Sequence, residues 1–220
     1  KNVTTDSFRA DVVEAGKPVM SGENPGLHYL NLQNGTVWRW NRPIYDPNGE
    51  LSHIRVENRL LPAGPTVKDI IADAAFYYGL VKFLGEQTRP VWSRMSFATA
   101  EANFISGARD GLTARLEWPT LGTIDVVELV GSHLLDDARL GLEALGVAPD
   151  CIEEYLGIIQ GRVDNRQNGA TWQLAALTEA GAGSRPDTRQ RREALARVLK
   201  QYLANQEAGA PVHTWSTSVE

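Results

Sequence analysis

The chain has 220 residues, of which 42% are hydrophobic and 22% are charged, and this ordinary globular composition excludes wholesale disorder. Its 27 acidic and 22 basic residues give a net charge of −5, which argues against a nucleic-acid partner. No apolar run approaches the roughly 18 residues that a membrane span requires, so we expect no membrane association.

The cysteine content and the first residues suggest where the protein is located and whether the chain is part of a longer protein. Cys151 is the single cysteine, which excludes an internal disulfide and a cysteine-rich zinc site. Nothing near Lys1 resembles a signal peptide, so we expect a reducing, cytoplasmic location. Because the chain begins Lys-Asn-Val without an initiator methionine, we expect it to be a piece of a longer protein.

The first third of the chain predicts an irregular segment followed by a hairpin. Residues 1–26 are polar and interrupted by glycine and proline, and we expect them to be irregular. Two expected strands, 27–33 and 36–42, flank the dipeptide Asn34-Gly35. This dipeptide is typical of a type I′ turn, because both central residues of that turn need a positive φ.

A third expected strand completes a small antiparallel sheet. A second turn signal at 46–49 precedes the strand 51–61, so that residues 27–61 form a meander. We expect the mostly apolar face of the third strand to pack on the helix that follows. That face consists of Ile54, Val56, Asn58 and Leu60.

After Pro62 the pattern becomes helical. Thr66 is a favourable N-cap, and apolar residues recur at helical spacing up to about Gly85, which predicts a helix with one apolar face. That face consists of Val67, Ile70, Ile71, Ala74, Ala75, Tyr78 and Val81. Further helices are expected near 97–109, 123–145, 149–163, 170–180 and 186–206, with a short strand at 113–118. The predicted fold class is α+β, with residues 66–206 mainly helical.

The third strand carries charged side chains at alternate positions. Because successive side chains of a strand point to opposite faces, one face carries His53, Arg55, Glu57 and Arg59. Solvated surface ion pairs, worth ~0–1 kcal/mol each, are one interpretation of this face. The preceding strand adds Arg39 and Arg42, and four arginines with a carboxylate suit an anionic ligand and its cation. Guanidinium groups bind phosphate or carboxylate bidentately, and glutamate supplies an oxygen ligand for Mg²⁺.

These residues also carry a resemblance to a known family. The run His-Ile-Arg-Val-Glu-Asn-Arg-Leu-Leu-Pro-Ala-Gly-Pro-Thr at 53–66, followed by 73–79, resembles the C-terminal half of bacterial glutamate–cysteine ligases. More broadly, it is similar to the carboxylate–amine ligases of the glutamine synthetase superfamily. Later blocks at 89–92, 168–173 and 211–215 also resemble this ligase family. The resemblance implies that the chain is part of a glutamine synthetase-like catalytic domain.

The resemblance implies a reaction and its cofactors, ATP and Mg²⁺. Such ligases phosphorylate the γ-carboxylate of glutamate, and the amine of an acceptor, here expected to be cysteine, displaces phosphate from γ-glutamyl phosphate. It implies that Glu57 ligates Mg²⁺, and that Arg59, with Arg55 on the same face, holds the transferred phosphoryl group or the substrate carboxylate. Residues assigned to the nucleotide are Arg39, Arg42 and His53, the last with a supporting role as the alternative. Metal and arginines together would neutralise the charge that spreads during phosphoryl transfer.

One departure from the family is important. These ligases carry further acidic metal ligands on strands of their N-terminal half, and residues 1–26 contain no such strand. We therefore expect the isolated chain to be an inactive part of a ligase, completed by a missing N-terminal half or by another subunit. Exposed strand edges would favour homo-oligomers. The alternative is a non-catalytic binding or assembly module that keeps the ligase scaffold, and the identity of the acceptor stays open.

Other polar residues allow a functional or an ordinary interpretation. Near the connection at Asn168-Gly169, the family resemblance places Arg162, Arg166 and Gln173 at the mouth of the active site, with plain helix surface as the alternative. His133 and His213 have no histidine partner at zinc-binding spacing. The sequence contains neither a Walker A motif nor a Gly-x-Gly-x-x-Gly fingerprint, which excludes those modes of nucleotide binding.

Overall fold

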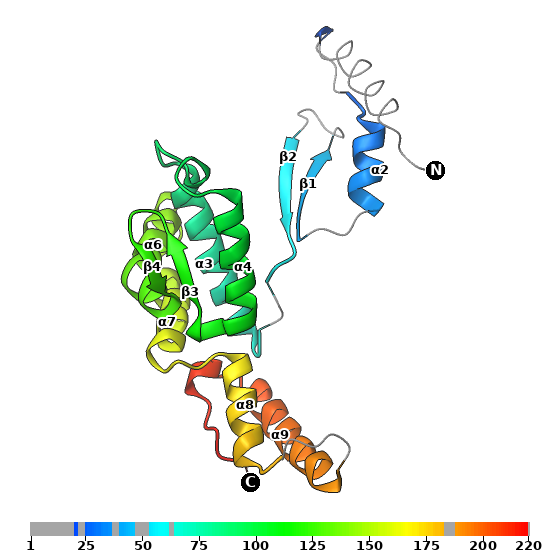
Figure 1. The fold of residues 1–220 in the computed structure, drawn as a ribbon, viewed down its shortest axis with the longest axis vertical. Helices are drawn as coiled ribbons and strands as arrows, with labels where there is room; N and C mark the ends of the chain where they lie inside the picture. The colour runs from blue at the N-terminus through cyan, green and yellow to red at the C-terminus, as the bar shows by residue number, and fades with distance from the viewer. Residues whose placement is uncertain are drawn as a thin grey trace. The chain divides into compact units, whose positions relative to one another are not determined.

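The structure is a computed structural model that describes residues 20–21, 25–36, 40–46, 53–61, 64–182 and 188–219. The chain divides into two units, residues 1–62 and residues 63–220. Within the described residues most elements are helices, and there are also two short antiparallel strand pairs (Figure 1). The predicted α+β class with a mainly helical second part is therefore confirmed.

In the first unit a helix replaces the first expected strand. Helix α2 spans His28–Thr36 and includes Asn34-Gly35, so the predicted hairpin turn at this dipeptide is wrong. The Asn34 side chain donates to the carbonyl of Pro43 at 3.1 Å, and the Asn34 carbonyl accepts from Arg42 at 3.1 Å. These two contacts tie the end of the helix to the following strand and satisfy one of its terminal carbonyls.

The first unit contains one described strand pair. Strands β1 (Asn41–Asp46) and β2 (His53–Asn58) are antiparallel, and the turn expected at 46–49 lies mostly outside the described residues. The expected three-stranded meander is thus a helix followed by two strands. On the face of β2 that we expected to pack on the following helix, Ile54 and Val56 are 73% and 61% exposed.

The second unit begins with α3 (Val67–Gly85), α4 (Phe97–Asp110) and a hairpin of β3 (Arg115–Trp118) and β4 (Gly122–Asp125). There follow α5 (Val126–Leu129), the π-helical turn η3 (Val130–Leu134), α6 (Leu135–Ala144), α7 (Pro149–Asp164), α8 (Gly169–Glu179) and α9 (Arg189–Ala208). Short 3₁₀ turns are η1 (Val91–Ser93), η2 (Gly111–Thr113) and η4 (Val212–Thr214). The helix expected over 123–145 is therefore divided among β4, α5, η3 and α6. No helix among the described residues is both long and apolar enough to cross a bilayer.

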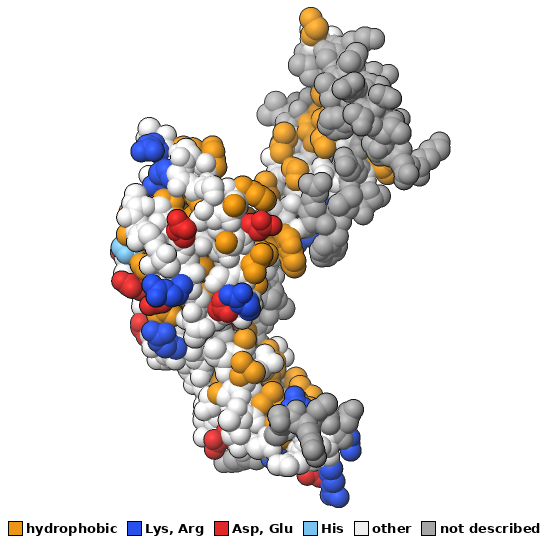
Figure 2. All heavy atoms as spheres, in the orientation of Figure 1, with side chains coloured by type: hydrophobic (Ala, Val, Ile, Leu, Met, Phe, Trp, Pro, Cys, Tyr) orange, Lys and Arg blue, Asp and Glu red, His pale blue; other side chains and the backbone are white. Residues whose placement is uncertain are grey.

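Helix α3 packs with a different side from the one predicted. Its N-cap is Thr66, as expected, and the Thr66 hydroxyl accepts from the backbone N–H of Asp69. The buried side carries Asp69, Ala72 and Gly79, whereas the predicted core face is largely exposed, with Val67 at 74%. Figure 2 shows hydrophobic side chains on the surface of both units. Because α3 is apolar around most of its circumference, periodicity alone did not identify the covered side.

Small residues allow α3 and α6 to approach backbone to backbone. A Cβ at Gly79 would lie 2.3 Å from the carbonyl oxygen of Ala138, and a Cβ at Gly141 would lie 1.9 Å from the carbonyl oxygen of Gly79. Any side chain larger than hydrogen at either glycine would force the helices apart. The core at this crossing includes the buried residues Ala72, Leu135, Ala138, Leu142, Ile152, Leu156, Ile158 and Ile159.

A second core holds the C-terminal segment against α8 and α9, which lie side by side in Figure 1. Trp172, Tyr202 and Trp215 form an aromatic cluster with ring centroids 5.1–5.9 Å apart. The indole N–H of Trp172 donates to the carbonyl of Ser216 at 2.9 Å, and that of Trp215 donates to Ala210 at 2.7 Å. Both buried indole donors are thus satisfied, as aromatic polar groups in a core require.

Candidate functional site

The predicted site residues lie on one face of the β1–β2 pair. The register places Arg42 opposite Glu57 and Asp46 opposite His53. Strand alternation then gives a common face, which we call the charged face. Besides Ile44, it carries Arg42, Asp46, His53, Arg55 and Glu57, together with Arg59 directly after β2.

Glu57 is bound by two guanidinium groups. Arg42 Nε donates to Glu57 Oε2 at 2.7 Å, its Nη2 lies 2.6 Å from the same oxygen, and Arg59 Nη2 lies 3.0 Å from it. The hydrogen bond from Arg59, with the positive charge of Arg42, lowers the pKa of the Glu57 carboxyl. Glu57 is therefore ionised at neutral pH, and its carboxylate orients both arginines.

The other end of the charged face is looser. Arg55 Nη1 lies 3.4 Å from Asp46 Oδ2 and 3.0 Å from His53 Nε2. Arg55 is 52% exposed, so its ion pair contributes little to stability, ~0–1 kcal/mol. With a neutral imidazole, three arginines face two carboxylates, which leaves the charged face one positive charge in excess. An anion placed here would meet guanidinium donors arranged for bidentate hydrogen bonds.

The described residues of the charged face offer few oxygen ligands for Mg²⁺. Mg²⁺ demands several oxygen ligands, usually one or two carboxylates with waters and substrate phosphates. No group of three or more His, Cys, Asp or Glu side chains gathers among the described residues. Glu57 offers one carboxylate, and two cations already contact its Oε2. The metal-ligand role of Glu57 therefore stays a prediction that needs further ligands from elsewhere.

A buried ion network in the second unit was not predicted from the sequence. Asp69 is fully buried, and its carboxylate accepts from Thr66 Oγ1 at 2.8 Å, from Arg162 Nη2 at 2.8 Å and from the Val212 backbone N–H at 3.2 Å. Arg162 Nη1 also donates to Asp73 Oδ1 at 2.5 Å. Burial raises the pKa of the Asp73 carboxyl, although Arg162 opposes that shift. The network joins α3, α7 and η4, and its i,i+4 aspartates were the one local signal in the sequence.

This network decides the role of the polar residues near Asn168. Because Arg162 is 12% exposed and committed to two aspartates, it is part of the fold. Arg166 is exposed and adopts a left-handed backbone with φ of 49°, and the exposed Gln173 side chain donates to the Gly169 carbonyl at 3.1 Å. Arg166, in the turn between α7 and α8, and Gln173, on α8, are thus exposed, and their placement at the mouth of an active site stays a prediction.

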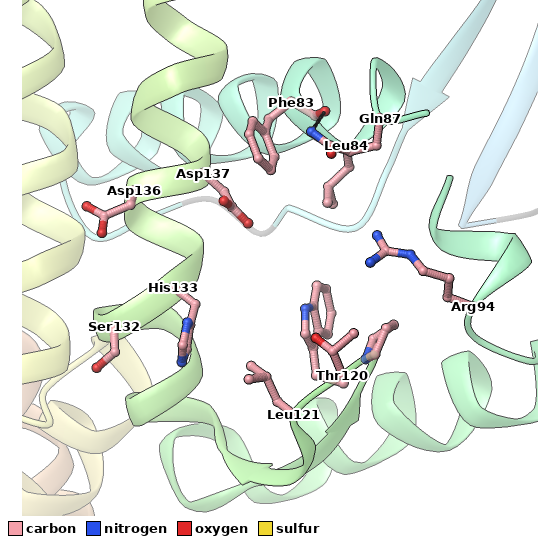
Figure 3. Close-up of a pocket in the computed structure, with 12 residues that line it drawn as sticks. Phe83, Leu84, Gln87, Arg94, Thr120, Leu121, Ser132, His133, Asp136 and Asp137 are labelled. Atoms are coloured by element: carbon pink, nitrogen blue, oxygen red, sulfur yellow. Dashed lines mark hydrogen bonds between the residues drawn. The ribbon is translucent and has the colours of Figure 1, made fainter. Parts of the chain in front are cut away.

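A hollow of about 330 Å³ lies in the second unit, remote in sequence from the charged face. It is lined by the end of α3, the segment after η1, the β3–β4 turn, and the η3–α6 region, and it is open to solvent (Figure 3). Its wall carries charges of both signs, with Arg94 on one side and Asp136, Asp137 and His133 on the other. Sequence reasoning missed it, because these residues come from four segments with no shared motif.

The structure brings together five of the six predicted site residues, since Arg42, His53, Arg55, Glu57 and Arg59 share the charged face. The sixth, Arg39, lies outside the described residues. Comparison with known proteins found no matching family model and no matching curated protein or solved structure.

Proposed function

We propose that this chain is the C-terminal part of an ATP- and Mg²⁺-dependent carboxylate–amine ligase that resembles glutamate–cysteine ligase and acts in the cytoplasm. The observation that carries the proposal is the arrangement of Arg42, on β1, and Arg59, directly after β2, which reach the same Glu57 carboxylate. Arg55 is on the same face two residues before Glu57. Three guanidinium groups on one small face suit a polyanion such as the triphosphate of ATP.

The proposed roles follow from what phosphoryl transfer requires, which is positioning and neutralisation of charge. Arg59 and Arg55 hold the transferred phosphoryl group or the glutamate carboxylate, and Arg42 contacts the nucleotide phosphates. Glu57 keeps Arg42 and Arg59 in place. The acidic residues that complete the Mg²⁺ site come, in this proposal, from the N-terminal half of the longer protein or from another subunit.

Isothermal titration of the chain with ATP and with a non-hydrolysable analogue tests the proposal. We expect micromolar binding that weakens by about tenfold or more in Arg59→Lys, because an ammonium cannot reproduce a bidentate guanidinium contact. The matched control is Arg115→Lys, which changes an exposed arginine of β3 whose ion-pair distance to Asp125 is 3.8 Å. Equal loss in both variants would refute a nucleotide role for the charged face, and absence of ATP binding would favour the second candidate function for this chain.

The variant Glu57→Gln separates two roles for this carboxylate. If Glu57 ligates Mg²⁺, the variant loses the Mg²⁺-dependent part of ATP binding. If Glu57 only orients Arg42 and Arg59, ATP binding weakens to the same extent with and without Mg²⁺, because the two guanidinium groups lose the carboxylate that positions them.

The second candidate function is a non-catalytic binding or assembly module. It is favoured by the contacts of Glu57 Oε2 with two arginines and by the lack of a three-ligand acidic group among the described residues. A module of this kind would bind anions by charge alone. Inorganic pyrophosphate would then compete with ATP at similar concentration and without Mg²⁺, whereas a ligase site would prefer the Mg²⁺-bound nucleotide.

A further inference from the structure

The hollow in the second unit has the size and lining of a small-molecule site. Its volume of about 330 Å³ falls in the range of ligand pockets, roughly 300–1,000 Å³. Apolar side chains of Phe83, Leu84, Trp118 and Leu121 form part of the wall. A neighbouring hollow of about 540 Å³ shares Arg94, Trp118, Pro119 and Thr120, so the site continues past the hairpin turn.

Opposite charges stand on opposite walls of this hollow. Figure 3 shows Arg94 reaching in from one side, with Asp137 and His133 on the other. Among the described residues, neither the Arg94 guanidinium nor the Asp137 carboxylate has a hydrogen-bond or ion-pair partner. Asp137 is half-buried, and desolvation raises the pKa of its carboxyl, with a smaller contribution from Asp136, although His133 opposes that shift. A ligand cation beside Asp137 would offset the desolvation and the repulsion from Asp136.

Two unusual backbone conformations shape the walls. Thr120, at the tip of the β3–β4 hairpin, has a φ of 73°, which a β-branched residue rarely adopts. His133 lies in the π-helical turn η3, a rare conformation that occurs frequently at functional sites. Backbone strain such as the positive φ of Thr120 is concentrated where ligands bind. Both features face the same hollow.

We propose that this hollow binds a small zwitterion with an apolar body, namely a free amino acid or a short peptide. Arg94 takes the carboxylate through its guanidinium fork, Asp137 takes the ammonium, and the side chain packs against Phe83, Leu84 and Leu121. This inference goes beyond the proposed function, because the hollow shares no residue with the charged face and the charge pattern alone selects the ligand. A purely anionic ligand would meet the Asp137 carboxylate, and a purely cationic one would leave Arg94 unpaired.

Titration calorimetry on the full chain tests the proposal with four probes. L-phenylalanine and glycyl-L-phenylalanine are the zwitterions, and they distinguish a free amino acid from a peptide. 2-Phenylethylamine lacks the carboxylate, and 3-phenylpropionate lacks the ammonium. We expect at least one zwitterion to bind with a Kd of millimolar or below, and both singly charged analogues to bind at least about tenfold more weakly.

Substitutions of Arg94 and Asp137 test whether the zwitterion binds in the hollow. Arg94→Gln and Asp137→Asn should each weaken the zwitterion about tenfold or more, since each removes one charge-assisted contact. The matched controls are Arg109→Gln and Asp125→Asn, whose side chains do not line the hollow and should leave the Kd unchanged. Circular dichroism confirms that each variant is folded. Failure of both zwitterions to bind, equal binding of either analogue, or equal binding by the Arg94 and Asp137 variants would overturn the proposal.

Discussion

The buried network around Asp69 allows a quantitative prediction for Arg162→Met. Methionine keeps an unbranched apolar stem but removes the guanidinium that contacts Asp69 at 2.8 Å and Asp73 at 2.5 Å. The side chains of Arg162 and Asp69 are 12% and 0% exposed, so water cannot replace the lost cation. Breaking one partner of a buried ion pair costs about 3–5 kcal/mol, because the remaining charge stays buried without compensation. That is a large share of the typical ~5–15 kcal/mol stability of a folded protein.

Urea denaturation followed by circular dichroism at the helical band measures this loss. With a denaturant slope of about 2 kcal/mol per molar, the midpoint should fall by about 2 M. The control is Arg139→Met, which breaks the more exposed ion pair between Arg139 and Glu153 and should cost no more than ~1 kcal/mol.

A second variant checks the physical reason. Asp69→Asn placed on top of Arg162→Met removes the uncompensated charge while the amide oxygen still accepts from Thr66 and from the backbone of Val212. The double variant should therefore be more stable than Arg162→Met alone. If Arg162→Met costs no more than Arg139→Met, or if the double variant is the less stable, the network is not a desolvated ion pair and the reasoning is refuted.

Three further predictions concern backbone and pH. Gly79→Ala should lower the free energy of unfolding by about 2 kcal/mol or more, because its Cβ would meet a backbone oxygen of α6 at 2.3 Å. The control Gly157→Ala has open space around its Cβ and should instead raise the free energy of unfolding by about 0.5–1 kcal/mol. Similar urea midpoints for the two variants would contradict the close crossing of α3 and α6. Thr120→Asn should raise the melting temperature by relieving a positive φ that asparagine tolerates, and a lower melting temperature would argue against strain there. Burial lowers the pKa of His213 below 6.5, so the folded state binds fewer protons than the unfolded state in that range. The stability that neutral His213 provides is present above about pH 6.5 and is lost as the pH falls. His213→Gln should reduce this loss of stability between pH 7 and pH 5.5, measured by urea denaturation at each pH. An unchanged dependence of stability on pH would exclude His213 as its source.

The helices of the second unit could be predicted because their signals are local. The expected ranges 97–109, 149–163 and 170–180 agree closely with α4, α7 and α8. Capping side chains and apolar spacing act within one or two helical turns, so the sequence alone determines them. Thr66 shows this directly, since its hydroxyl accepts from the backbone of Asp69, three residues later.

Elements whose state depends on distant contacts were not predictable. Residues 27–33 alternate weakly between apolar and polar, a pattern that short strands and helix ends share. Contacts of Asn34 with Pro43 and Arg42 accompany the helical outcome, and they join residues 8 and 9 positions apart. The predicted core face of α3 failed for a similar reason, because both sides of that helix are apolar and tertiary packing chose between them.

The sequence predicted which candidate site residues share a face of the strand, but not which of their side chains contact one another. Strand alternation correctly placed His53, Arg55 and Glu57 on one side of β2. The pairing of Glu57 with Arg42 depends on the register between β1 and β2, which the turn signal at 46–49 does not determine by itself. Asp69 and Arg162 are 93 positions apart, and no sequence pattern in a single chain links them.

The two faces of β2 differ in polarity, since one is part of the charged face and the other carries exposed apolar side chains. Ile54 and Val56 point away from the side that carries Arg55 and Glu57, because side chains alternate along a strand. Their exposed apolar surface favours burial at about 25 cal/mol per Å², so a partner segment would cover this side first. In the proposed ligase, a partner segment would pack on this side, and the opposite side would stay open to phosphate and carboxylate. Under that proposal, one strand would carry an apolar interface on one face and an anion site on the other.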